Sequence, residues 1–220
     1  MLQNKLVTRL EGALPKQAPA EINSARNKRE IQIVEEARNL LAEKGYSKFS
    51  MRGVAASLGI SLRTVQHYYP TKRDLLVETV KYTLAHYYHE QFHVLFEKNE
   101  TKEPIDKFLI MIDYMLEDVR DPFSIRFFTE LWALSLRDID ASIAMDTVYT
   151  LHRQNIEQLI AEINPNLSAR RVSHRAAIVT ALIEGLMLLL GDGKPDHSEL
   201  EDIDQEVRRR ILDIVTRPED

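Results

Sequence analysis

Apolar residues recur every three or four positions along most of this chain, which is the spacing of side chains on one face of an α-helix. No stretch shows the alternation of apolar and polar residues that is typical of a strand. The pattern therefore predicts an all-α fold. The expected helices cover residues 27–43, 51–58, 62–69, 72–98, 104–119, 122–136, 138–163, 168–190 and 199–216.

Two of these helices are short and adjoin within residues 51–70. Ser50 and Ser61 each precede one of them, and each has a hydroxyl that can accept a hydrogen bond from a free amide of the first turn. Gly59 lies between them, where a sharp reversal needs a residue that tolerates a positive φ, and Pro70 ends the second helix. This pattern is typical of a helix-turn-helix motif, whose second helix can lie in the major groove of DNA. The alternative is an ordinary helical hairpin.

The residues around this motif resemble a known family. The segment 29–82 resembles the DNA-binding domain of the tetracycline-repressor (TetR) family and follows its pattern in order, without a gap. Two positions depart from the pattern: Gln66 stands where the family commonly has Tyr, and Gly53 where it commonly has an acidic residue. The matching residues are Ile33, Ala37, Leu40, Leu41, Gly45, Tyr46, Ser50, Met51, Arg52, Val54, Ala55, Leu58, Gly59, Ile60, Ser61, Thr64, Val65, Tyr68, Tyr69, Pro70, Thr71, Lys72, Leu75 and Leu76.

The predicted organisation has three parts. Residues 1–25 form a flexible N-terminal extension, since no helical period is sustained there. Residues 26–82 form a three-helix DNA-binding domain around the helix-turn-helix motif. Residues 83–220 form a helical body, which the resemblance identifies as a ligand-binding and dimerisation domain. The long helix 72–98 joins the last two parts and is a natural lever between them.

The polar side chains of the motif divide into two groups of expected DNA contacts. Side chains with suitable donors and acceptors are candidates for base edges: Arg52, Arg63, Thr64 and Gln66. A second group is expected mainly to contact phosphates: Ser50, Ser61, His67, Tyr68 and Lys72. The role of Lys72 is the one that the resemblance implies.

Charge is distributed unevenly along the chain. The formal net charge is −5, but residues 1–82 carry 14 Lys and Arg against 8 Asp and Glu, and the remainder carries 15 against 26. A basic head on an acidic body is the asymmetry expected of a DNA-binding protein. The chain has no Cys, which excludes disulfides and thiolate chemistry. The N-terminus lacks an apolar signal segment, and the longest apolar run, Leu186–Leu190, is too short to span a membrane. We therefore expect a soluble, cytoplasmic protein without a membrane partner.

The body is rich in aromatic and Met side chains that could line an apolar cavity. The resemblance implies that a small-molecule inducer binds in such a pocket, although the sequence does not identify the molecule. Core packing is the alternative for each of these residues. Glu184, a lone acid in an apolar helix, could bind a cationic ligand or form a bond across a dimer. The candidate ligand-binding residues are Tyr88, Phe92, Phe108, Met111, Tyr114, Met115, Phe127, Trp132, Tyr149, His152 and Glu184.

The last two long helices are the expected dimer interface. The helix 168–190 is apolar on most of its circumference, so it must be covered on nearly all sides. The resemblance implies that it and the helix 199–216 form a four-helix bundle with a second subunit. Ala181 and Gly185, four positions apart, would permit close approach. The alternative is that the helix 168–190 is the centre of a monomer.

These observations predict a homodimeric transcriptional regulator, a repressor that releases a pseudo-palindromic DNA operator when an inducer binds. One rival hypothesis is an architectural DNA-binding factor regulated by a protein partner. Another is a helical enzyme with an appended regulatory head. The chain lacks a Gly-rich phosphate loop, a nucleophile elbow and a zinc-protease motif, so we expect no enzymatic activity and no cofactor. His89 and His93 have a spacing that suits a metal, but they lie opposite the apolar stripe, so we expect no metal site.

Overall fold

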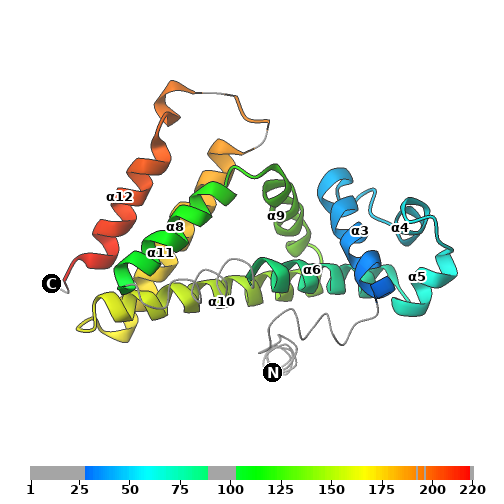
Figure 1. Cartoon of the computed structure of the whole chain (residues 1–220), viewed down its shortest axis with the longest axis horizontal. Coiled ribbons are helices and arrows are strands. Elements are labelled where there is room, and N and C mark those ends of the chain that lie inside the picture. The colour runs from blue at the N-terminus through cyan, green and yellow to red at the C-terminus, as the bar shows by residue number, and fades with distance from the viewer. Residues whose placement is uncertain (1–27, 89–102, 192, 196, 219–220) are drawn as a thin grey trace. The chain divides into compact units, whose positions relative to one another are not determined.

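The computed structural model describes residues 28–88, 103–191, 193–195 and 197–218, and every regular element in these ranges is a helix (Figure 1). The all-α prediction is therefore confirmed for the part of the chain that the structure describes. The predicted extension at residues 1–25 lies outside these ranges. The α-helices are α3 (Lys28–Lys44), α4 (Met51–Ser57), α5 (Leu62–Tyr68), α6 (Lys72–Tyr88), α8 (Pro104–Asp118), α9 (Pro122–Ser135), α10 (Ile139–Ile163), α11 (Ala169–Leu190) and α12 (Ile203–Thr216).

The predicted helix 199–216 was wrong at its start. A 3₁₀-helix, η2 (Ser198–Leu200), occupies the first positions, and α12 begins only at Ile203. Asp202 separates the two elements with a left-handed backbone, φ +55°. Asp adopts this conformation at a lower cost than most residues, and the conformation interrupts a right-handed helix. The short turn therefore cannot run directly into α12.

The chain forms two compact units that do not follow its linear order. Of the described residues, the first unit contains 28–88 and 126–148, and the second contains 103–125 and 149–218. Residues of α9 and α10 therefore belong to both units. The first unit contains the whole described part of the predicted DNA-binding domain, together with residues 83–88 and 126–148, which were expected in the body. The predicted boundary at residue 83 remains a prediction.

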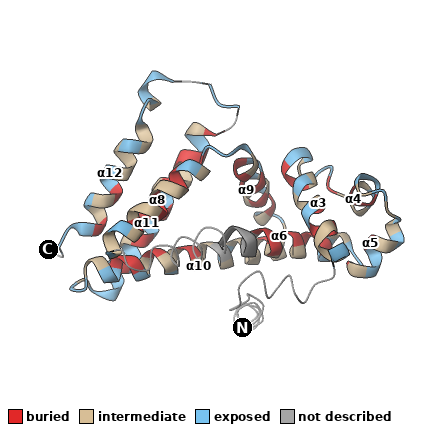
Figure 2. Cartoon of the chain, in the orientation of Figure 1, coloured by how far each residue is buried: buried red, intermediate tan, exposed pale blue. Residues whose placement is uncertain are grey.

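The first unit has an apolar core built mainly from α3, α6 and α9. Ile33 and Ala37 on α3 and Leu75 on α6 are completely buried, as is Phe127 on α9 (Figure 2). The predicted apolar face of α3 is therefore the buried one. Because α4 and α5 are only seven residues each, they depend on this core for their position.

The second unit is organised around α11. Ala176, Val179 and Ile183 of this helix are buried, as are Ile156 on α10 and Ile211 on α12. Among the described residues, α11 is the one helix that is long and apolar enough to cross a membrane by length and composition. The apolar stretch is thus longer than the run Leu186–Leu190 on which the sequence prediction relied. The core helix of a globular protein passes the same test, and α11 is part of the core of this unit.

Candidate nucleic-acid interface

The two short helices begin at the serines that the sequence indicated. The Ser50 Oγ accepts a hydrogen bond from the Gly53 amide at 3.0 Å, and the Ser61 Oγ accepts one from the Thr64 amide at 3.1 Å. Both serines have the extended backbone of an N-cap residue. The two predicted caps are therefore present, and they fix the starts of α4 and α5.

The turn between α4 and α5 depends on Gly59. Its φ is +62°, a left-handed conformation that glycine adopts without steric cost. The Ile60 amide donates to the Ala55 carbonyl at 3.0 Å, and the Gly59 amide donates to the Ala56 carbonyl at 3.2 Å. These two bonds form a Schellman motif, which satisfies carbonyls at the end of α4. The motif reverses the chain and directs it into α5.

One face of α5 is buried and the other is open to solvent. Val65 is completely buried, whereas Arg63, Gln66 and His67 are exposed. Tyr69, which follows the helix, is 3% exposed and has the extended backbone expected before a proline. The predicted division of α5 into a core face and a polar face is therefore present. Arg52, on α4, is also exposed.

The other predicted DNA contacts have partners inside the protein. Thr64 is half-buried, and its hydroxyl lies 2.9 Å from the Ser61 Oγ. The rings of His67 and Tyr68 meet edge to face, with their centroids 5.1 Å apart. Thr64 therefore combines a half-buried position on α5 with a role in capping that helix.

Lys72, the expected phosphate contact, is the first residue of α6, and its side chain contacts the turn that follows α3. Its Nζ is 3.9 Å from the centre of the Tyr46 ring and donates to the Tyr46 carbonyl at 3.4 Å. Partial burial lowers the pKa of Lys72 below its usual range. An ammonium group over an aromatic face is held by a cation–π interaction. Lys72 thus joins the start of α6 to the residues that precede α4.

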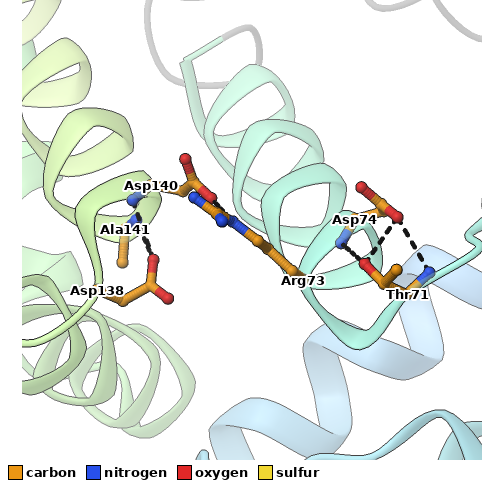
Figure 3. Close-up of polar contacts among 6 residues, drawn as sticks. All are labelled: Thr71, Arg73, Asp74, Asp138, Asp140 and Ala141. Carbon is orange, nitrogen blue, oxygen red and sulfur yellow. Dashed lines mark hydrogen bonds and ion pairs between the residues drawn. The ribbon is translucent and has the colours of Figure 1, made fainter.

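Two further contacts in the first unit were missed by the sequence analysis. The Glu130 carboxylate, on α9, accepts a hydrogen bond from the Tyr46 amide at 2.9 Å. Arg73, in the first turn of α6, points toward Asp140 at the start of α10 and forms an ion pair with it (Figure 3). These contacts join residues 84 and 67 positions apart, so no local pattern could have indicated them.

In the second unit, Glu184 is half-buried in the middle of α11. The Tyr149 hydroxyl, on α10, donates to the Glu184 carboxylate at 2.9 Å. Burial raises the pKa of Glu184 to about 7, and the nearby Asp118 acts in the same direction. Burial lowers the pKa of His152 to about 4. The unit thus contains an acid and a base that both favour their neutral forms.

The predicted ligand-binding residues are divided between the two units. Phe127 and Trp132 belong to the first unit, whereas most of the others belong to the second. Phe92 lies outside the described residues, as does the side chain of Tyr88. The residues of this set in the second unit are Phe108, Met111, Tyr114, Met115, Tyr149, His152 and Glu184.

The described part of the second unit has two surface cavities, and both lie away from the predicted ligand-binding residues. One, of about 370 Å³, lies between the end of α11 and the η2 segment, and the other, of about 380 Å³, lies between α11 and α12. None of the predicted ligand-binding residues lines either cavity. The described residues contain no group of three or more His, Asp or Glu side chains that could hold a metal, and His89 and His93 lie outside them.

Comparison with known proteins adds to these observations. Residues 33–79 match the family model of bacterial regulatory proteins of the TetR family. Comparison with curated protein sequences found no match. The matched segment begins in α3 and ends in α6, so it contains the whole helix-turn-helix motif.

Solved structures show the same fold over most of the chain. A TetR transcription regulator from Haloarcula marismortui is 19% identical, with a TM-score of 0.66 over 84% of this chain and 95% of that one. A protein from Saccharomonospora viridis, described as a transcriptional regulator in complex with choline, is 19% identical, with a TM-score of 0.66 over 86% of this chain and 96% of that one. The multidrug binding protein EbrR, complexed with imidazole, is 17% identical, with a TM-score of 0.60 over 88% and 98%.

Proposed function

Because the chain belongs to the TetR family of bacterial regulatory proteins, we propose that it is a transcriptional repressor that releases a pseudo-palindromic operator when a small molecule binds its helical body. The observation that carries DNA binding is the polar face of α5. Arg63, Gln66 and His67 are exposed there, while Val65 fixes the opposite face in the core. This is the arrangement that a recognition helix needs in order to enter a major groove.

Within this interface the contacts have two roles. Arg52, Arg63, Thr64 and Gln66 contact base edges and determine the operator sequence. Ser50, Ser61, His67, Tyr68 and Lys72 contact phosphates and fix the register. Ser50 can still donate its hydroxyl proton to a phosphate, because its oxygen accepts the Gly53 amide through a lone pair. Ser61 can do so when Thr64 donates in the pair that their hydroxyls form.

Selection of bound sequences from a random pool of duplex DNA, at near-physiological salt, tests this function. Recovery of one inverted-repeat motif is the expected result. Recovery of unrelated sequences would mean that the basic head binds only the DNA backbone, and it would favour an architectural factor regulated by a protein partner. The salt concentration must be fixed, because binding to phosphates alone weakens steeply as salt rises.

The repressor acts as a homodimer through α11 and α12. The support is a stripe on α11 that lacks a covering in the described residues of the second unit: Ile178 is 48% exposed and Leu188 is 59% exposed. Between them, a Cβ added to Gly185 would meet no atom within 4 Å. Gly185 lies seven positions after Ile178 and three before Leu188, so the three positions share one face of the helix. A second copy that covers this face would place two recognition helices on two half-sites.

The ligand site of the body favours a cationic molecule. Glu184 supports this class, because burial raises its pKa to about 7 and a nearby cation would stabilise the ionised carboxylate. Two structures of similar fold are described with choline and with imidazole bound. Calorimetric titration with choline, and with its uncharged carbon isostere, tests the charge requirement. Equal affinity for the two molecules would contradict it. An affinity for choline that does not fall in Glu184→Gln would also contradict it.

Ligand binding in the body tilts α6 and changes the separation of the two heads, so that both can no longer fit their grooves. A coupling free energy of about 1–3 kcal/mol suffices for a useful switch. Operator affinity measured with and without the ligand gives this coupling directly. A bound ligand that changes neither the operator affinity nor the head separation would contradict the mechanism.

A further inference from the structure

The geometry points to Glu130, assisted by Asp140, as a positioning residue for DNA recognition. Both belong to residues 126–148, outside the segment that matches the family model, yet both lie in the first compact unit with the helix-turn-helix motif. Glu130 fixes the turn that leads into α4, and Asp140 fixes the start of α6. The inference rests on the proposed DNA-binding function, which it extends to residues that do not touch DNA.

The turn after α3 is built closely around the Glu130 carboxylate. The Tyr46 amide donates to one carboxylate oxygen at 2.9 Å, and a Cβ on Gly45 would lie 2.9 Å from the other. Gly45 also has φ +71°, so a side chain there would be strained as well as crowded. Glycine at this position therefore lets the carboxylate approach the backbone directly.

The same turn is held from its other side by α6. Lys72 donates to the Tyr46 carbonyl and lies over its ring, so both polar groups of the Tyr46 backbone have a charged partner. Phe49, three residues later, is 1% exposed, and Ser50 then caps α4. The placement of Tyr46 is thus transmitted through a short, packed segment to the start of the helix-turn-helix motif.

The second contact joins two helix starts that are each fixed by a cap. Thr71 and Asp74 cap α6, with the Thr71 amide donating to Asp74 at 3.0 Å and the Asp74 amide donating to Thr71 at 3.1 Å (Figure 3). Asp138 accepts the Asp140 and Ala141 amides at 3.0 and 3.1 Å. The Arg73–Asp140 pair therefore connects two backbones of defined position.

Two contacts at different points restrict the head in a way that one contact cannot. The apolar core places the motif, and the two polar contacts then fix its orientation at two separate points, the turn before α4 and the start of α6. The Glu130 contact is the stronger, since it is partly buried and joins a charged acceptor to a backbone amide. The Arg73 side chain is 59% exposed, so its pair with Asp140 contributes less.

The test compares specific and non-specific DNA binding of Glu130→Ala in the full chain. We expect affinity for the selected operator to fall about tenfold, while affinity for a random duplex changes less than about twofold. The salt dependence should not change, because no phosphate contact is removed. Glu130→Gln keeps an acceptor for the Tyr46 amide and should recover most of the operator affinity. Asp140→Ala alone should lower it about two- to threefold.

Glu162→Ala is the matched control. It also removes a carboxylate from a helix, but Glu162 is exposed and accepts only a local hydrogen bond, from Gln158 at 3.1 Å. We expect it to bind the operator as the unaltered chain does. A loss in Glu162→Ala equal to that in Glu130→Ala would reduce the effect to net charge and overturn the inference.

Hydrogen exchange gives a second measurement that does not depend on DNA. Peptides that span the turn after α3 should exchange faster in Glu130→Ala and not in Glu162→Ala, because only the former frees the Tyr46 amide. Unchanged exchange would overturn the inference, and so would faster exchange with unchanged operator affinity. If the unaltered chain selects no inverted repeat, the proposed function fails, and the exchange result still decides whether Glu130 holds the turn.

Discussion

Replacing Glu184 by Gln should stabilise the protein at neutral and alkaline pH. The side chain is half-buried on α11, where it accepts a hydrogen bond from the Tyr149 hydroxyl at 2.9 Å. Burial raises the pKa of this carboxyl from 4.5 to about 7. Gln has nearly the same shape and keeps an oxygen that can accept the Tyr149 hydrogen bond, but it carries no charge at any pH.

The sign of the effect follows from proton binding. Between pH 4.5 and about 7, the folded protein keeps the Glu184 proton while the unfolded chain has lost it. The folded state therefore binds more protons, and the free energy of unfolding falls as the pH rises through this range. Each unit of the pKa difference corresponds to about 1.4 kcal/mol, so the full loss is about 3 kcal/mol. The loss is absent below pH 4.5 and complete above pH 7.

His152 has the opposite effect at lower pH. Its burial lowers its pKa from 6.5 to about 4, so in this range the unfolded chain binds the extra proton and stability rises with pH. The two slopes oppose each other between pH 4.5 and 6.5 in the unaltered protein. Glu184→Gln removes one of them. We therefore expect the variant to gain stability as the pH rises through this range, while the unaltered protein changes little from these two groups.

Urea unfolding at fixed protein concentration, measured from pH 4.5 to 8, checks this prediction. The quantity to compare is the difference in the free energy of unfolding between Glu184→Gln and the unaltered protein. It should grow by about 3 kcal/mol from pH 4.5 to pH 8. Glu162→Gln, an exposed residue, should show no such growth. A pH-independent difference for Glu184→Gln would refute the argument that this carboxyl is desolvated.

Three further predictions concern DNA binding, the turn and the dimer. Gln66→Ala should relax specificity at one operator position, whereas Lys72→Ala should weaken all sequences and lower the salt slope by about 1, measured by titration of a duplex panel. Gly59→Ala should lower the free energy of unfolding in urea by about 1 kcal/mol, because φ is +62° and no atom is close enough to clash. Ile178→Glu should dissociate the dimer in sedimentation equilibrium, whereas Ser173→Glu, which is exposed on another face of α11, should not.

The helix-turn-helix motif could be predicted because its determinants act locally. The Ser50 and Ser61 hydroxyls bond to amides three residues ahead, and the φ of Gly59 closes the turn through bonds within five residues. Such short-range preferences are present in the sequence itself. The same reasoning gave the buried position of Val65 from helical spacing alone.

The ligand-binding set stays a prediction, because apolar spacing does not separate a pocket lining from a core. Phe108 and Phe127 are both completely buried, yet they belong to different compact units. The sequence analysis could single out Glu184, because a lone acid in an apolar helix is chemically unusual. The break at Asp202 was missed, since a left-handed Asp leaves no mark in a pattern of apolar positions.

The contacts of Glu130 and Asp140 explain why the motif and the functional head have different limits. A fragment that ended at Tyr88 would contain every residue of the matched segment and every predicted DNA contact. It would lack the acceptor of the Tyr46 amide and the partner of Arg73. Phe127 and Leu131, which are buried in the same unit, would also be missing from its core. Because α9 and α10 complete the DNA-binding head, its structure depends on the position of these two helices. Both helices continue into the unit that contains Glu184.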